Sequence, residues 1–127
     1  MKTILFSILI LFSVNGFSFN WKKVSVDSVG DLYVDVDVDS IKKHNGLIYY
    51  WLLVDLLEPF QSGTNSYIDK FKVDCREEKQ TQLNFTAYSQ SMGKGRILFE
   101  DTPNEILYPK PKEVRYIVMK FVCDYAK

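Results

Sequence analysis

The sequence is poor in the residues that usually build catalytic and metal sites. Its 127 residues include one histidine and two cysteines. A structural zinc site takes about four histidine or cysteine ligands, and a nucleophile triad needs a base held by a third group. The single histidine, His44, precedes Asn45-Gly46 and is expected to be an exposed turn residue. We therefore predict no enzyme activity, no catalytic, cofactor-binding or metal-binding residue, and no cofactor.

The sequence also lacks an excess of positive charge. Sixteen lysines and arginines balance sixteen acidic residues, which gives a formal net charge of zero at pH 7. Nucleic-acid-binding domains need a basic face, whereas the lysines here are spread along the chain in pairs such as Lys42-Lys43. Each pair is expected to lie in a solvated turn, and no nucleic-acid partner is predicted.

The longest hydrophobic run stands at the beginning of the chain. Lys2 is followed by an apolar stretch from Thr3 to Val14 and by small residues at Gly16 and Ser18. This order is typical of a signal peptide, although a buried N-terminal strand is an alternative. No second run approaches the length of about 18 residues that a transmembrane helix requires. We predict a signal peptide at residues 1–18, a single domain at 19–127, and no transmembrane segment.

The two cysteines, Cys75 and Cys123, can form only one intramolecular bridge, and an oxidising compartment favours it. Their 48-residue separation would make a disulfide worth about 4 kcal/mol in the chain-entropy model. A thiolate nucleophile or a metal pair would need further cysteine or histidine partners close by. A disulfide between Cys75 and Cys123 is therefore predicted.

Hydrophobic alternation predicts about six strands. They are expected at 21–26, 32–39, 47–57, 66–75, 80–91 and 96–100. The apolar run at 47–57 is expected to be a central strand buried on both faces. The segment 101–111 holds three of the four prolines and is expected to be irregular.

The C-terminal segment changes to a helical period. One apolar stripe, expected to face the core, consists of Val114, Ile117, Val118, Phe121, Val122 and Tyr125. A second, narrower stripe of Tyr116, Met119 and Cys123 would face a neighbouring strand or loop. The predicted fold is α+β, an antiparallel sheet of about six strands covered on one face by a C-terminal helix and tied by one disulfide.

The stretch VDVDVD at 34–39 places three aspartates at alternate positions. A calcium loop that starts at Asp35 would need glycine and glutamate where Ser40 and Gly46 stand. Asp35 and Asp37 have a spacing compatible with an acid-base pair. No apolar pocket is evident, however, that would raise the pKa of one of the two carboxyl groups. We expect valines inside and aspartates in solvent, with Asp37 or Asp39 capping a helical turn at 40–43.

Several short motifs together resemble one family. The order VDVDSI, YYWLLVDL, VDC, FTAYSQSMGKGRI and a final FVC resembles the surface-adhesin protein E-like domains of exported bacterial proteins. The resemblance implies an antiparallel sheet, a C-terminal helix fastened through Cys75 and Cys123, and a role in binding host extracellular proteins. Residues 15–20 contain no cysteine, so no lipid anchor is predicted. Residues 106–108 lack the tryptophan that relatives often carry there.

The function predicted from these features is that of a non-catalytic exported binding module, such as a surface adhesin-like protein that contacts extracellular or envelope proteins. An exposed sheet face or the loops at 58–65 and 101–111 would provide the contacts. The alternative is a periplasmic structural or envelope-maintenance protein. Both fit an exported chain, periplasmic, secreted or attached at the cell surface. Neither the protein ligand nor the oligomeric state follows from the sequence.

Overall fold

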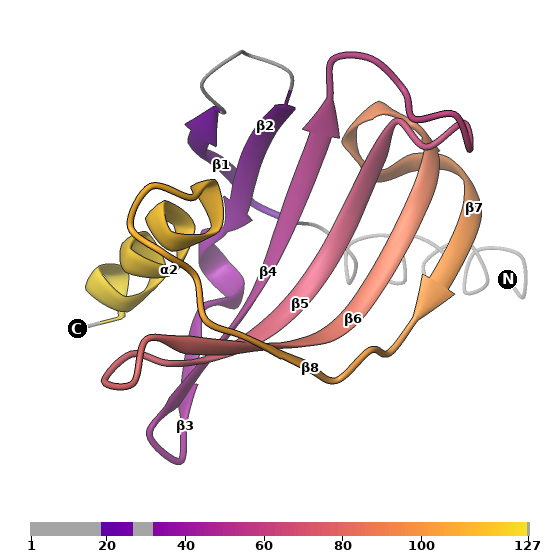
Figure 1. The fold of residues 1–127 in the computed structure, drawn as a ribbon. Coiled ribbons are helices and arrows are strands. Elements are labelled where there is room, and N and C mark those ends of the chain that lie inside the picture. The colour runs from indigo at the N-terminus through magenta and orange to yellow at the C-terminus, as the bar shows by residue number, and fades with distance from the viewer. Residues whose placement is uncertain (1–18, 27–31, 127) are drawn as a thin grey trace, which may run out of the picture.

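The computed structural model describes residues 19–26 and 32–126, so the predicted signal peptide lies outside the described residues. Its strands form one curved antiparallel sheet in the order β1-β2-β4-β5-β6-β7 (Figure 1). In addition, β3 pairs with β4, and β8 pairs with β6. The strands are β1 (Trp21–Val26), β2 (Leu32–Asp37), β3 (Lys42–His44), β4 (Leu47–Leu56), β5 (Ser66–Asp74), β6 (Lys79–Gln90), β7 (Lys94–Asp101) and β8 (Glu105–Leu107). The helices are η1 (Val38–Ser40), η2 (Ser91–Gly93) and α2 (Val114–Tyr125). The predicted fold class is confirmed, with β3 and β8 as two short strands beyond the expected six.

Strand β4 lies inside the sheet, between β2 and β5. Its consecutive residues Leu52 and Leu53 are both buried although they point to opposite faces. This burial on both faces explains why the strand has a nearly continuous apolar sequence rather than a simple alternation. The central position predicted for this segment is confirmed.

The two additional strands are short extensions next to turns. Asn45 and Gly46 have φ angles of 52° and 80°, so they form the tight hairpin turn between β3 and β4. Strand β8 lies in the segment that was expected to be irregular, and it pairs with Gln80–Gln82 of β6. That expectation was wrong because Pro103 and Pro109 flank the three paired residues and leave their backbone donors available.

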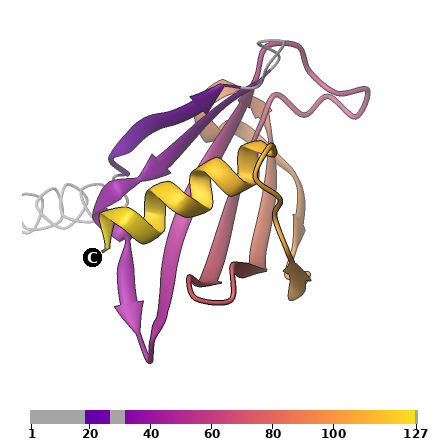
Figure 2. The ribbon, with the colours of Figure 1, turned by 60° about the vertical axis from the view of Figure 1, so that its left-hand side comes forward.

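One face of the sheet carries the main core, and α2 crosses this face (Figure 2). The helix packs against β1 and β4. The core consists of Val34, Val36, Ile48, Tyr50, Leu52, Val54, Leu56, Phe71, Val73, Val118, Met119, Val122 and Cys123. Burial of this apolar surface is the main source of stability, at about 25 cal/mol per Å².

The orientation of α2 differs from the one expected. Val118 and Val122 are buried as predicted, but Met119 and Cys123 are buried with them, whereas Ile117 and Tyr125 are 45% and 52% exposed. Compared with the expectation, the helix is thus rotated about its axis so that Met119 and Cys123 of the narrower stripe also face the core. The disulfide explains the rotation, because Cys123 must point at Cys75 just beyond β5, with the two Cα atoms 6.0 Å apart.

The stretch at 34–39 follows its predicted register only in part. Val34 and Val36 are buried, but Val38 leaves the strand and begins η1. Asp37 is only 5% exposed, and its Oδ1 accepts a hydrogen bond of 3.0 Å from the backbone N–H of Asn20. The expectation that the aspartates face solvent was therefore wrong for Asp37, because the segment before β1 covers it.

The turn predicted near residues 40–43 occurs slightly earlier, as η1. Asp37 occupies the N-cap position, but its side chain makes no capping hydrogen bond. Instead the hydroxyl of Ser40 donates to the Asp37 carbonyl oxygen at 2.8 Å.

Among the described residues, no helix has the length and apolar content needed to cross a bilayer.

Candidate functional site

Pairing between strands brings lysines to both sides of two aromatic residues, on the sheet face opposite α2. Lys42 of β3 lies opposite Tyr49 of β4, and Lys70 of β5 lies opposite Trp51. The ammonium nitrogen of Lys70 is 5.4 Å from the ring centroid of Trp51 and 6.0 Å from that of Tyr49. Both distances fit cation–π contacts. We call the surface formed by Lys42, Lys43, His44, Tyr49, Trp51 and Lys70 the basic-aromatic face.

The basic-aromatic face surrounds a shallow hollow of about 570 Å³. The described residues that line the hollow include three lysines and His44, and none of them is acidic. The ring of His44 lies 6.3 Å from that of Tyr49 in an edge-on arrangement. Ser40 also lines the hollow, and its hydroxyl donates to the carbonyl oxygen of Asp37 and accepts a hydrogen bond from the backbone N–H of Trp51. Such a surface attracts negative charge and offers flat aromatic area against which a partner can pack.

Aromatic contacts extend this surface toward β1. The ring of Phe19 stacks on Trp21, with 4.7 Å between the centroids, and lies 6.3 Å from Trp51. Phe19 remains 45% exposed. The apolar part of the face therefore continues beyond the hollow, along the segment that also covers Asp37.

The sequence suggested an exposed sheet face as a contact surface but did not identify the residues of this one. It placed Lys42-Lys43 in a solvated turn and treated the other lysines as scattered, whereas Lys70 lies in a strand that pairs with β4. It also assigned the run at 49–51 to the core. Only Tyr50 is there, at 1% exposure, and its two neighbours face the other way. The alternation of lysines with Phe71 and Val73 was the available signal, but the strand order was needed to place them beside the aromatic residues.

The two loops proposed as binding segments also expose apolar side chains. Phe60 is 54% exposed in the segment 58–65, and Ile106 and Tyr108 are 53% and 65% exposed in the segment 101–111. Exposed apolar side chains in such small numbers are common on protein surfaces. The basic-aromatic face is the stronger candidate because several charged and aromatic side chains lie together around one hollow.

Within residues 19–26 and 32–126, no three histidine, cysteine, aspartate or glutamate side chains come together in a way that could hold a metal ion. Asp35 is half-buried, and burial raises the pKa of its carboxyl, an effect that the nearby Lys23 partly offsets. The absence of a metal or other cofactor stays a prediction from the sequence.

A family model described as surface-adhesin protein E matches residues 21–124. The chain belongs to this family. The resemblance found in the short sequence motifs is thereby confirmed over almost all of the described residues. The family is one of surface adhesins rather than enzymes. The family is thus one of proteins displayed on the bacterial surface. Family membership does not identify the partner of this chain.

Solved structures of Haemophilus influenzae protein E share the fold. A second crystal form of that protein is 18% identical, with a TM-score of 0.58 over 83% of this chain and 90% of the other. The structure from non-typeable Haemophilus influenzae is 15% identical, with a TM-score of 0.57 over 87% and 84% of the two chains. At these identities the likeness supports the fold alone. None of the curated proteins matches the chain.

Proposed function

We propose that this member of the surface-adhesin protein E family is a non-catalytic exported binding module that contacts an extracellular or envelope protein through its basic-aromatic face. The observation that carries the proposal is the hollow at this face, where lysines and His44 surround Tyr49 and Trp51 without an acidic residue in the lining. The family membership supports a binding role over a catalytic one.

The chemistry of the face defines the kind of partner segment. Single exposed ion pairs contribute only about 0.2–1 kcal/mol each, so lysines alone would give weak binding. Aromatic side chains dominate many interfaces because they bury a large area at a low entropic cost. We therefore propose that the partner presents an acidic segment with aromatic or other apolar residues next to its carboxylates.

A charge-reversal pair with a matched control tests the face. Lys42→Glu with Lys43→Glu is expected to weaken binding to immobilised extracellular-matrix proteins or to solubilised envelope proteins by at least about tenfold. Lys110→Glu with Lys112→Glu makes the same change of charge at exposed positions before α2 and is expected to leave binding within about twofold. Equal losses in both variants would contradict a localised site.

A defined probe tests the partner chemistry independently of any natural ligand. A random copolymer of glutamate and tyrosine is expected to bind more tightly than polyglutamate of equal charge, because only the copolymer can pack against Tyr49 and Trp51. Binding of both should weaken as salt screens the lysines. A single-stranded oligonucleotide serves as the comparison polyanion. If the oligonucleotide bound more tightly than the copolymer, a protein partner would be the wrong assignment.

Protease treatment of intact cells separates the two cellular roles. Digestion of the protein on intact cells would support display at the surface and the adhesin-like function. Full protection would instead favour the alternative, a periplasmic structural or envelope-maintenance protein. In the second case the basic-aromatic face would bind an envelope component, and the charge-reversal variants would lose that contact.

A further inference from the structure

The face of the sheet that carries α2 contains a cavity that the proposed function does not use. Its volume is about 430 Å³, within the range typical of small-molecule sites. The sheet forms the floor, Val114 and Val118 of α2 form one wall, and Leu107 of β8 closes another side. The cavity exists because α2 packs against β1 and β4 and leaves the part of the face over β5 and β6 less covered.

A buried carboxyl group lies in the floor of this cavity. Asp69 of β5 is 5% exposed, and it stands between Leu52 and Phe85 on the neighbouring strands. The side-chain amide of Gln82 forms a hydrogen bond with the carboxyl. The second oxygen, Oδ1, has no hydrogen-bond partner among the described residues. A buried carboxylate oxygen without a donor is costly, and natural proteins usually provide one.

The charged residues around the cavity do not neutralise Asp69. Arg115 of α2 lines the cavity, but its Nε is 3.3 Å from Oε2 of Glu113, with both side chains about half exposed. Glu105 of β8 adds a second acidic group to the lining. The lining therefore favours a positively charged ligand over a negatively charged one.

Aromatic rings stand beside the carboxyl. The rings of Tyr67 and Phe85 lie 5.2 Å apart, centroid to centroid, and both residues line the cavity. Ring faces attract organic cations, most strongly where water is excluded. Most of the remaining lining is aliphatic and suits the hydrocarbon part of a small molecule.

We propose that this cavity binds a small organic amine, whose ammonium group donates to Oδ1 of Asp69 and whose apolar body packs under α2 against Tyr67, Phe85 and Val118. The site is independent of the basic-aromatic face, which lies on the other side of the sheet. Burial raises the pKa of Asp69 to about 7, so the carboxyl is ionised and able to pair with a cation in mildly alkaline solution. An ammonium group would supply the hydrogen-bond donor that this oxygen lacks.

Three probes with similar skeletons and different head groups test the proposal. Isothermal titration calorimetry at about pH 8, where an alkylamine is protonated, would compare 2-phenylethylamine, 2-phenylethanol and 3-phenylpropanoate. The amine is expected to bind at least about tenfold more tightly than the alcohol, and the carboxylate most weakly. NMR titration should place the largest shifts at Tyr67, Phe85 and Val118.

Two matched substitutions locate the charge that matters. Asp69→Asn keeps the size of the side chain and removes a buried charge, so the variant is expected to fold, which circular dichroism would check. It should lower the affinity for the amine by roughly tenfold and leave that for the alcohol unchanged. Asp39→Asn removes the same charge from the exposed turn η1 and should change neither affinity.

The proposal fails if the amine does not bind, if the alcohol binds as tightly, or if the carboxylate binds best, which would make Arg115 the anchor. It also fails if Asp69→Asn and Asp39→Asn weaken amine binding equally, since the attraction would then be general. The double variant Lys42→Glu with Lys43→Glu should bind the amine like the wild type. This result separates the cavity from the basic-aromatic face.

Discussion

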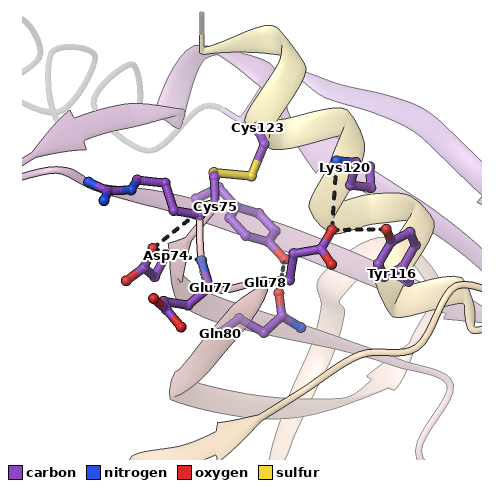
Figure 3. The surroundings of a disulfide bond; sticks show 10 residues. Asp74, Cys75, Glu77, Glu78, Gln80, Tyr116, Lys120 and Cys123 are labelled. Atoms are coloured by element: carbon purple, nitrogen blue, oxygen red, sulfur yellow. Dashed lines mark hydrogen bonds and ion pairs between the residues drawn. A yellow bond between two sulfur atoms is a disulfide. The ribbon is translucent and has the colours of Figure 1, made fainter.

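The phenol of Tyr116 on α2 donates a hydrogen bond of 2.9 Å to Oε2 of Glu78, in the turn between β5 and β6 (Figure 3). The hydrogen bond raises the pKa of the Tyr116 phenol. Lys120 lies 3.7 Å from the same carboxylate oxygen. Glu78 has a φ of +51°, which residues other than glycine seldom adopt. The disulfide between Cys75 and Cys123 joins the same turn to the same helix, so a covalent and a polar link act side by side.

The disulfide is expected to provide much of the stability of the domain. Replacing both Cys75 and Cys123 by alanine should lower the free energy of unfolding by up to about 4 kcal/mol, because the bridge closes a loop with a separation of 48 residues. Urea titration followed by circular dichroism measures the change. Wild-type protein unfolded in reductant should match the double variant. An unchanged midpoint in the variant would show that the polar contacts of Glu78 suffice.

The sequence was enough to predict the six longer strands, the helix and the bridge, because each rests on a local pattern or on a count of cysteines. Alternating apolar residues mark β2 and β5, and the continuous apolar run marks β4. Asn45 and Gly46 predicted a turn because both residues tolerate positive φ, and the structure shows that the turn is that of a hairpin. These features depend on a few neighbouring positions and can therefore be predicted without knowledge of the tertiary contacts.

Features that depend on distant contacts could not be predicted in the same way. The alternation in β5 placed Asp69 on the same side as Phe71, but the cavity above it depends on where α2 and β8 pack. Alternation alone places Asp37 in solvent, but the segment before β1 covers it. The basic-aromatic face likewise needs the strand order, since Lys42 and Lys70 reach Tyr49 and Trp51 only through pairing with β4.

Two glycines with similar backbone angles are expected to differ in their tolerance of alanine. A Cβ on Gly93, whose φ is +68°, would lie 2.7 Å from Cδ1 of Ile68, which is buried near Leu53. A Cβ on Gly46, whose φ is +80°, would meet no atom within 4 Å. Both substitutions strain the backbone, but only Gly93→Ala must also displace a packed side chain. Thermal unfolding should show Gly93→Ala to be less stable than Gly46→Ala by about 1 kcal/mol or more. Equal losses of stability in the two variants would mean that the Ile68 side chain can move away from the added Cβ without cost.

A buried hydrogen bond connects Tyr50 to Gln80, with the phenol donating to Oε1 at 3.0 Å. Both residues are 1% exposed. Tyr50→Phe should lower the free energy of unfolding by about 1–3 kcal/mol, because it leaves the buried amide oxygen without its donor. Tyr49→Phe is the matched control on the other face and should cost less. Adding Gln80→Leu to Tyr50→Phe should recover part of the loss. A double variant less stable than the sum of the single changes would contradict this account.

Asp69 should make the protein less stable as the pH rises. Burial raises its pKa from 3.8 to about 7, only partly offset by the hydrogen bond from Gln82. Between these values the folded protein holds a proton that the unfolded chain has lost, so unfolding releases a proton and stability falls with increasing pH. The contribution is fully present below about pH 4 and is lost as the pH passes about 7.

Asp69→Asn removes this titration and leaves the charges of Glu105 and Arg115, which line the same cavity, in place. The phenol of Tyr67 has a pKa raised to about 12 by burial, with a further contribution from Asp69, and does not titrate in this range. Relative to wild type, the variant should therefore gain a few kcal/mol of stability between about pH 4 and about pH 8. Urea titrations of both proteins at the two pH values measure the gain. A constant difference between variant and wild type would show that the carboxyl has an ordinary pKa and that water or a counter-charge reaches the cavity floor.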